Sequence, residues 1–329
     1  MQSVHIPSRR DALKAISAAG ASALALPAFG QADYPSRPIK IIVPLPAGGV
    51  ADVAVRSIAD RLQVTLKQPI VVENKPGGLF AIGMQAVTSA PADGYTLLHL
   101  NVGMLAVQAT MKRYDLLKQF APISEANFGP TVLFASMKAP FTNVPEMIAY
   151  GRANPGKINY GTTGAGSLEH LLAHSLAKAG GFEATNVPFK GGPDAAISLI
   201  QGDTHLLPTI YQLGKQFVEK GQMRILGVFA DERLTALPDI PTIKQLGLSA
   251  PNMSYWGGFA ALAGVPAPII ETLRREIAAA VVFPAVRERT ESLGSLVSFS
   301  PSSADFARKI AYDLDWMGNA VKSANLNLS

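Results

Sequence analysis

The sequence predicts an α/β fold in which strands alternate with helices, so that mostly parallel sheets are covered on both faces. Short β-rich apolar runs are followed by segments with helical periodicity, over 39–100 and again over 144–187. That alternation is typical of parallel sheets sandwiched between helices. A strand–glycine loop–helix design also occurs once in each half of the chain. The length of 329 residues suits one large or two medium α/β domains.

The elements follow from their local patterns. Continuous apolar or β-branched runs predict strands at 39–45, 70–73, 96–100, 158–160, 185–187, 204–208, 224–229 and 255–262. Helices are predicted at 81–88, 144–153, 167–179, 268–283, 284–293 and 302–324. A further helix follows the first strand, because Val55, Ile58, Ala59, Leu62 and Leu66 fall on one helical face.

The N-terminus has the pattern of an export signal. Arg9 and Arg10 precede an apolar, Ala-rich stretch from Ala15 to Ala28, which is too short to span a bilayer. The adjacent arginines favour the twin-arginine route over general secretion, although Ala12 replaces the usual aromatic residue. We expect a cleaved signal peptide at 1–32, with Gly30 as the alternative cleavage point, and a periplasmic location.

Composition excludes several classes of function. The formal net charge is +5 and would fall to +3 once Arg9, Arg10, Lys14 and Asp11 left with the signal. Without a run of Lys or Arg, this charge gives little support for nucleic-acid binding. The chain has no Cys, which excludes disulfides, thiol catalysis and Cys-ligated metals.

Two glycine loops are the candidate binding elements. One is 42–49, before the helix with Asp52 and Arg56, and the other is 158–167, before the helix with His170. Glycine lets the backbone approach a ligand, and a helix N-terminus offers unpaired N–H groups to an anion. Each loop alone could equally be a connecting turn, but two equivalent loops favour a shared anion site.

The chain resembles the Bug family, the substrate-binding receptors associated with tripartite tricarboxylate transporters. The similarity covers essentially the whole chain after the signal, in order. The matching segments are 34–44, the PAGG sequence at 46–49, 71–77, 90–98, 153–157, 161–167, 187–191, 237–242 and 264–268.

The resemblance implies a type II periplasmic binding protein fold, with two Rossmann-like lobes joined by two crossover strands and a ligand cleft between them. Lobe 1 would be 33–129 with 255–329, and lobe 2 would be 130–254. It implies a receptor without a bound metal or cofactor. We expect a monomer that serves membrane transporter subunits or, as an alternative, a membrane sensor. The ligand would be a mono- or dicarboxylate, contacted by Pro46, Ala47, Gly48 and Gly49 in one lobe and Thr162, Thr163, Gly164 and Ser167 in the other.

Departures from the family pattern bear on selectivity. Val50, Ala51, Leu79, Phe80 and Ala81 replace positions that are small or polar in the family. Because a buried ammonium group needs acceptors, these apolar residues predict a carboxylate without an amino group. Further candidate ligand contacts, weighed against ordinary packing, are Phe80, His170, Phe189 and Tyr211.

Two other functions have partial support in the sequence. A secreted α/β hydrolase could use Ser167 with a histidine, but the sequence around Ser167 lacks the second glycine of a nucleophile elbow. His170 and His174 have a spacing that can hold a metal, yet no third ligand is evident nearby. Neither an enzyme nor a metal site is therefore predicted.

Overall fold

The computed structural model describes residues 34–324 apart from residues 236, 250, 252 and 294. The predicted signal peptide at 1–32 lies outside these residues. From Arg37 onward the chain forms one compact unit. Among the helices described, none combines the length and the apolar character that crossing a membrane would require.

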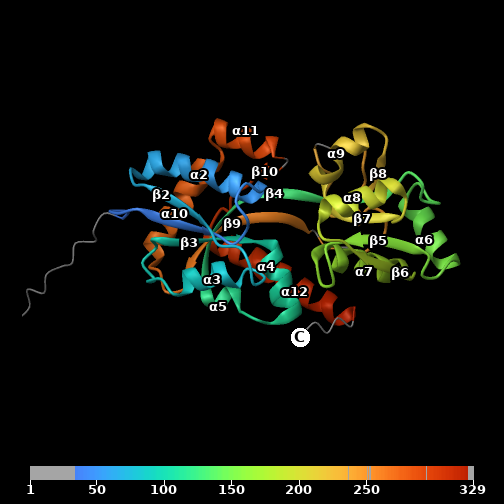
Figure 1. Ribbon diagram of the computed structural model, residues 1–329, viewed down its shortest axis with the longest axis horizontal. Coiled ribbons are helices and arrows are strands. Elements are labelled where there is room, and N and C mark those ends of the chain that lie inside the picture. Colours follow the sequence, from blue (N-terminus) through green and yellow to red (C-terminus); the bar gives the residue numbers. More distant parts are fainter. Residues whose placement is uncertain (1–33, 236, 250, 252, 294, 325–329) are drawn as a thin grey trace, which may run out of the picture. The chain divides into compact units, whose positions relative to one another are not determined.

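The first group of elements builds one end of the sheet. In chain order these are β1 (Ile39–Val43), α2 (Val50–Leu66), β2 (Ile70–Asn74), α3 (Ala81–Thr88), β3 (Thr96–Asn101), α4 (Val102–Met111) and α5 (Leu116–Gln119). In Figure 1, α2 lies on one side of these strands, and α3 and α4 lie on the other.

A long strand, β4 (Phe120–Ser136), leads from the first group to the second. The second group consists of α6 (Val144–Ala153), β5 (Ile158–Thr162), α7 (Leu168–Gly180), β6 (Ala184–Pro188), α8 (Gly192–Gln201), β7 (Leu206–Ile210), α9 (Tyr211–Glu219) and β8 (Met223–Val228). The chain returns through β9 (Ser254–Leu262) to α10 (Ala267–Val281), α11 (Pro284–Ser292), β10 (Leu296–Val297) and α12 (Ser303–Ser323).

The sheet is mixed, with its strands in the order β2-β1-β3-β9-β4-β7-β5-β6, while β8 and β10 also pair with β4. The outer strands are parallel, as predicted: β1 pairs with β2 and β3, and β5 pairs with β6 and β7. The central pairings of β4 and β9 are antiparallel. The expectation of mostly parallel sheets is wrong there, because one strand leaves the first group and the other returns to it.

Strand β4 changes partners along its length. Pro130 still pairs with Ser254 of β9, whereas Thr131 pairs with Ile210 of β7. This two-group α/β architecture is the predicted fold class. The predicted lobe limits at 129–130 and 254–255 fall near this change of partner, and they stay a proposal.

The first group's core extends to the crossing strands. Trp256 on β9 is 3% exposed, and its Nε1 donates to Asp313 Oδ2 at 2.7 Å. Its ring meets Phe306 of α12 edge-on. At its far end α12 reaches α7, where Lys178 Nζ donates to Ser323 Oγ at 2.9 Å.

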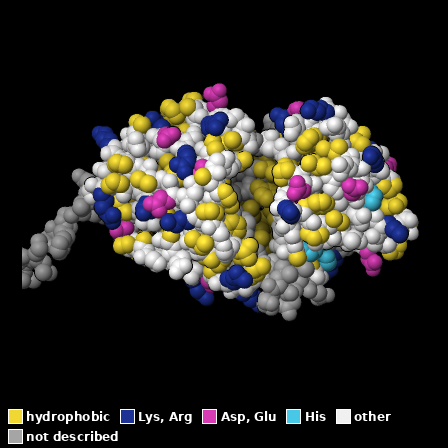
Figure 2. Space-filling model, in the orientation of Figure 1, with side chains coloured by type: hydrophobic (Ala, Val, Ile, Leu, Met, Phe, Trp, Pro, Cys, Tyr) yellow, Lys and Arg dark blue, Asp and Glu magenta, His cyan; other side chains and the backbone are white. Residues whose placement is uncertain are grey.

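Figure 2 shows a groove between the two groups with hydrophobic side chains along its walls.

Candidate functional site

The first glycine loop is held by the helix that follows it. Residues 46–49 are exposed between β1 and α2, and Gly48 has a φ of +79°. The Gly48 N–H donates to Asp52 Oδ2 at 2.8 Å, and Asp52 is 3% exposed. Arg56 Nε and Asn74 Nδ2 donate to Asp52 Oδ1 at 3.0 and 2.8 Å. The loop conformation therefore depends on the Asp52 carboxylate.

The Asp52 carboxylate is stabilised in its ionised form. Burial raises its pKa, but the hydrogen bonds from Arg56, Gly48 and Asn74 outweigh burial and leave that pKa below its usual value. Asn74 Nδ2 also donates to the Leu45 carbonyl oxygen at 3.2 Å, which ties β2 to the loop.

In the second loop several predicted contact groups already bond within the chain. Thr162 is fully buried; its Oγ1 donates to Asn186 Oδ1 at 2.8 Å and accepts from the Gly164 N–H at 3.2 Å. Ser167 caps α7, since its Oγ accepts the His170 N–H at 3.3 Å. Thr162 and Gly164 thus shape the loop, and their role as ligand contacts stays a prediction.

A buried carboxylate that sequence reasoning missed lies beside this loop. Glu169 is 6% exposed, and its Oε2 accepts from Thr163 Oγ1 at 3.0 Å. Its Oε1 accepts from the hydroxyl of Tyr255 on β9. Burial, with Glu169 nearby, raises the pKa of Tyr255 well above its usual value, so the Tyr255 hydroxyl stays protonated and donates.

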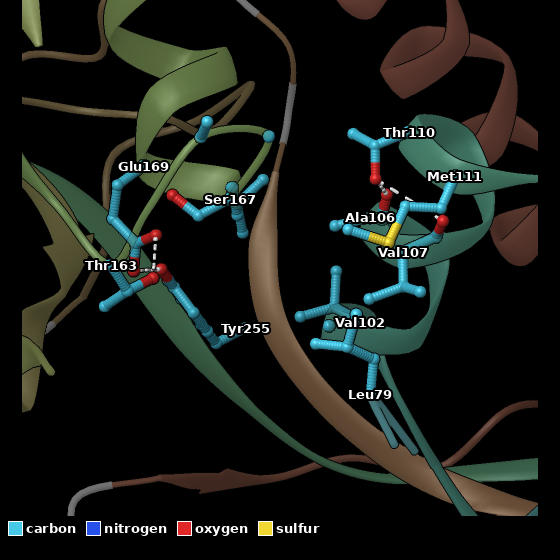
Figure 3. A pocket seen from close by; sticks show the side chains of 14 residues that line it. Leu79, Val102, Ala106, Val107, Thr110, Met111, Thr163, Ser167, Glu169 and Tyr255 are labelled. Atoms are coloured by element: carbon cyan, nitrogen blue, oxygen red, sulfur yellow. Dashed lines mark hydrogen bonds between the residues drawn. The ribbon is translucent and has the colours of Figure 1, made fainter. Parts of the chain in front are cut away.

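One cavity of about 260 Å³, here called the α4–α7 cavity, separates α4 from the second loop. Its lining residues are Leu79, Val102, Gly103, Ala106, Val107, Thr110, Met111, Thr163, Ala165, Gly166, Ser167, Leu168, Glu169 and Tyr255. Figure 3 shows the two walls, with Thr163, Ser167, Glu169 and Tyr255 facing the mostly apolar side chains of α4 and Leu79. The cavity is thus polar on one wall and apolar on the other.

A second cavity of about 280 Å³, here called the hinge cavity, lies where β4 and β9 pass from one group of elements to the other. Its lining residues are Leu45, Val50, Ala51, His99, Asn101, Val102, Gly103, Asn127, Ile210, Tyr255, Trp256, Gly257 and Ser295. The two cavities share Val102, Gly103 and Tyr255, so they are adjacent. Together they extend from the first turn of α2 to the second loop.

Two residues that line the hinge cavity each have a side-chain nitrogen that is closed to solvent and lacks a partner among the described residues. These atoms are His99 Nδ1 and Asn101 Nδ2. His99 is 4% exposed, and burial lowers its pKa to about 4, so the imidazole is neutral at physiological pH. Unpartnered buried polar groups are uncommon in native proteins.

The charges on the cavity walls are few. Among the lining residues of both cavities none is Lys or Arg, and Glu169 is the one carboxylate. An anion bound there would rely on N–H groups, hydroxyls and water rather than on an ion pair.

Only some of the predicted ligand-contact residues line the two cavities. Thr163 and Ser167 line the α4–α7 cavity, and the first loop reaches the hinge cavity through its neighbours Leu45, Val50 and Ala51. The remaining candidates were Pro46, Ala47, Gly48, Gly49, Thr162, Gly164, Phe80, His170, Phe189 and Tyr211; none of them lines either cavity. Their contact with a ligand stays a prediction.

Four of these side chains have other surroundings. The Phe80 ring packs against Gly103, where an added Cβ would lie 3.3 Å from its Cζ. His170 Nδ1 accepts the Gly166 N–H at 3.1 Å. Phe189 lines a separate cavity with the exposed Lys190. Tyr211 begins α9, and its neighbour Ile210 is the residue that reaches the hinge cavity.

The histidine pair on α7 does not converge. His170 uses Nδ1 within the loop, and His174 Nε2 lies 3.4 Å from Ser323 Oγ. Within the part of the chain that the structure describes, no group of three or more His, Cys, Asp or Glu could hold a metal ion.

Known proteins are similar to this chain in sequence and in fold. A family model described as tripartite tricarboxylate transporter family receptor matches residues 54–326. A UPF0065 protein of Bordetella pertussis is 33% identical over 298 residues, which cover 89% of this chain and 91% of that protein.

Solved structures of receptors have a similar fold. A TctC solute-binding protein from Polaromonas has a TM-score of 0.79 at 28% identity, over 88% of this chain and 99% of that one. Rpa4515 of R. palustris, solved with adipate, has a TM-score of 0.73 at 28% identity, over 89% and 99%.

Proposed function

We propose that this chain, which belongs to the tripartite tricarboxylate transporter receptor family, captures a small organic carboxylate between its two glycine loops. The family and its solved relatives are substrate-binding receptors, so the chain is a solute-binding receptor rather than an enzyme. The carboxylate is the part that we propose, and the adipate bound to Rpa4515 supports it.

The adjacency of the two cavities carries the proposal. They share Val102, Gly103 and Tyr255 and are lined by residues from both groups of elements. The first turns of α2, α4 and α7 border them, and helix N-termini favour anions. A ligand there would contact both groups at once, and it would stabilise their approach to each other.

The contacts of Ser167 do not favour a hydrolase. Ser167 Oγ accepts from the backbone N–H of His170, whereas the His170 ring bonds to Gly166 through Nδ1. A nucleophilic serine needs an imidazole nitrogen within hydrogen-bond reach of its hydroxyl. The His170 ring is instead part of the loop.

We also propose that the protein works in the periplasm, as a monomer that delivers its ligand to membrane transporter subunits or to a sensor. The receptor family and the export pattern at Arg9 and Arg10 support this location. Replacing both arginines by Lys should leave precursor in the cytoplasm. Normal periplasmic accumulation of that variant would instead indicate general secretion.

A thermal-shift screen of small mono- and dicarboxylates tests the binding function. At a ligand concentration of 100 times Kd, binding stabilises the fold by about 2.7 kcal/mol, which is roughly a 5–10 °C rise in Tm. Lys190→Ala is a suitable control, because Lys190 is exposed and lines neither cavity. Multiple-turnover conversion of a ligand, lost in Ser167→Ala, would contradict the proposal.

A further inference from the structure

Glu169 brings a negative charge to the α4–α7 cavity that no cation of the cavity wall offsets. Its two carboxylate oxygens accept from the hydroxyls of Thr163 and Tyr255. Both donors are neutral, so they hold the carboxylate in place without cancelling its charge. Among the described residues that line the cavity, none is Lys or Arg. The first turn of α7, which contains Glu169, supplies at most roughly half a positive charge. A net negative charge therefore remains on this wall.

The side-chain donors of the cavity wall are largely used within the chain. The hydroxyls of Thr163 and Tyr255 donate to Glu169, and Thr110 Oγ1 donates to the Ala106 carbonyl oxygen at 2.7 Å. A carboxylate can accept about four hydrogen bonds, so the two from Thr163 and Tyr255 leave sites for a ligand. Because a buried charge is costly without a counter-charge, a cationic group that donates hydrogen bonds complements this wall.

The first glycine loop and Glu169 border different cavities. Leu45, Val50 and Ala51, the neighbours of that loop, line the hinge cavity and not the α4–α7 cavity. Glu169 lines the α4–α7 cavity and not the hinge cavity. A carboxylate that contacts the first loop is therefore at one end of the two adjacent cavities, and a cationic group at Glu169 is at the other end.

The wall that faces Glu169 suits an apolar chain between these two ends. Val102, Ala106 and Val107 of α4 line the α4–α7 cavity opposite Glu169, as Figure 3 shows. Val102 also lines the hinge cavity, so apolar surface continues from one cavity into the other. Burial of methylene groups along this surface would contribute to affinity.

We propose that the ligand is an ω-amino carboxylate, whose carboxylate contacts the first loop and whose ammonium group lies against Glu169. Its methylene chain lies along α4, and Glu169 determines specificity for the far end. This inference rests on the proposed carboxylate-binding function and names the class of carboxylate. It restricts the sequence-based expectation of a ligand without an amino group to the carboxylate end, next to Val50 and Ala51, because that expectation did not include Glu169.

Three six-carbon ligands test the inference in the unmodified protein: hexanoate, 6-aminohexanoate and 2-aminohexanoate. The first has no amino group, the second has one at the far end, where it is protonated at pH 7.5, and the third has one beside the carboxylate. Calorimetry at pH 7.5 should find 6-aminohexanoate bound at least tenfold more tightly than either of the others. The corresponding sets with four and eight carbons extend the test to other lengths.

Hexanoate or 2-aminohexanoate binding as tightly as 6-aminohexanoate, in the set that binds best, would overturn the inference and leave the proposed function standing. No binding by any member of the three sets would overturn the proposed function with it. Neither outcome depends on a variant that must fold.

Glu169→Gln assigns the effect to one residue. It keeps the size of the side chain and removes its charge, so the preference for 6-aminohexanoate over hexanoate should fall at least fivefold, while hexanoate affinity stays within threefold. Glu183→Gln, the same charge change at an exposed residue outside both cavities, should leave the preference unchanged. An unchanged preference in Glu169→Gln, with the fold intact by circular dichroism, or an equal fall in Glu183→Gln, would overturn the inference.

Discussion

The backbone N–H of Gly48 donates to the carboxylate of Asp52 at 2.8 Å, so the first glycine loop closes on the first turn of its own helix. That carboxylate also accepts from Arg56 and Asn74. One buried side chain thus fixes the position of the loop relative to both α2 and β2.

Replacing Asp52 should therefore disturb folding and binding together. Asp52→Ala leaves the Gly48 N–H and the Asn74 side chain without this partly buried acceptor, and we expect a loss of about 1–3 kcal/mol in the free energy of unfolding. Asp60→Ala, at an exposed position of the same helix, should change that free energy by less than about 0.5 kcal/mol. Denaturant titration of both variants measures the difference, and equal effects would mean that Asp52 does not organise the loop.

Gly48 and Gly156 form a matched pair for testing the loop in binding. They have φ values of +79° and +72°, and an added Cβ would meet nothing within 4 Å at either position. Gly→Val should strain the backbone similarly at both positions, because L residues disfavour backbone conformations with positive φ. Only Gly48→Val should weaken carboxylate binding, by at least tenfold in calorimetry. Equal loss in Gly156→Val would show that general destabilisation is responsible.

Glu125 should give the stability a distinct pH dependence. Burial in β4 raises its pKa to about 7 against the opposing effect of Lys309, and Asp313 raises it further. The folded state therefore keeps a proton that the unfolded state releases near its usual pKa of 4.5. This contribution to stability is present below pH 4.5 and is lost as the pH rises to 7, by up to about 1.4 kcal/mol per pH unit.

The check compares the protein with Glu125→Gln between pH 5 and 8. His99 contributes a slope of the opposite sign, since its lowered pKa makes the fold less stable as the pH falls below 6.5. Subtracting the free energy of unfolding of Glu125→Gln from that of the unmodified protein at each pH removes the contribution of His99, which both proteins share. We expect the unmodified protein to lose stability relative to Glu125→Gln as the pH rises, and parallel curves would contradict this.

Local signals predicted much of the fold. The predicted helices at 81–88 and 144–153 match α3 and α6, because turn residues such as Pro76-Gly77-Gly78 and Pro155-Gly156 punctuate the chain near them. Strand β4 was missed, since Pro122, Gly129 and Pro130 interrupt its pattern. Helix α4 was missed because its mostly apolar sequence gives no amphipathic period.

The candidate site was only partly predictable. Both glycine loops were found, and Thr163 and Ser167 do line a cavity. Glu169 and Tyr255 are 86 residues apart in the sequence, so their contact arises only when β9 returns past α7. His99 and Asn101 did carry a signal, as two polar residues at the end of an otherwise apolar strand, the second at a helix N-cap.

Native mass spectrometry of the purified protein with a set of carboxylates shows whether the protein is a carboxylate receptor. We expect a complex whose mass is that of one protein and one carboxylate. Ligand released after prolonged incubation should have an unchanged mass, because a receptor binds without turnover. A ligand of altered mass, or the absence of any carboxylate complex across the set, would contradict a carboxylate-receptor function.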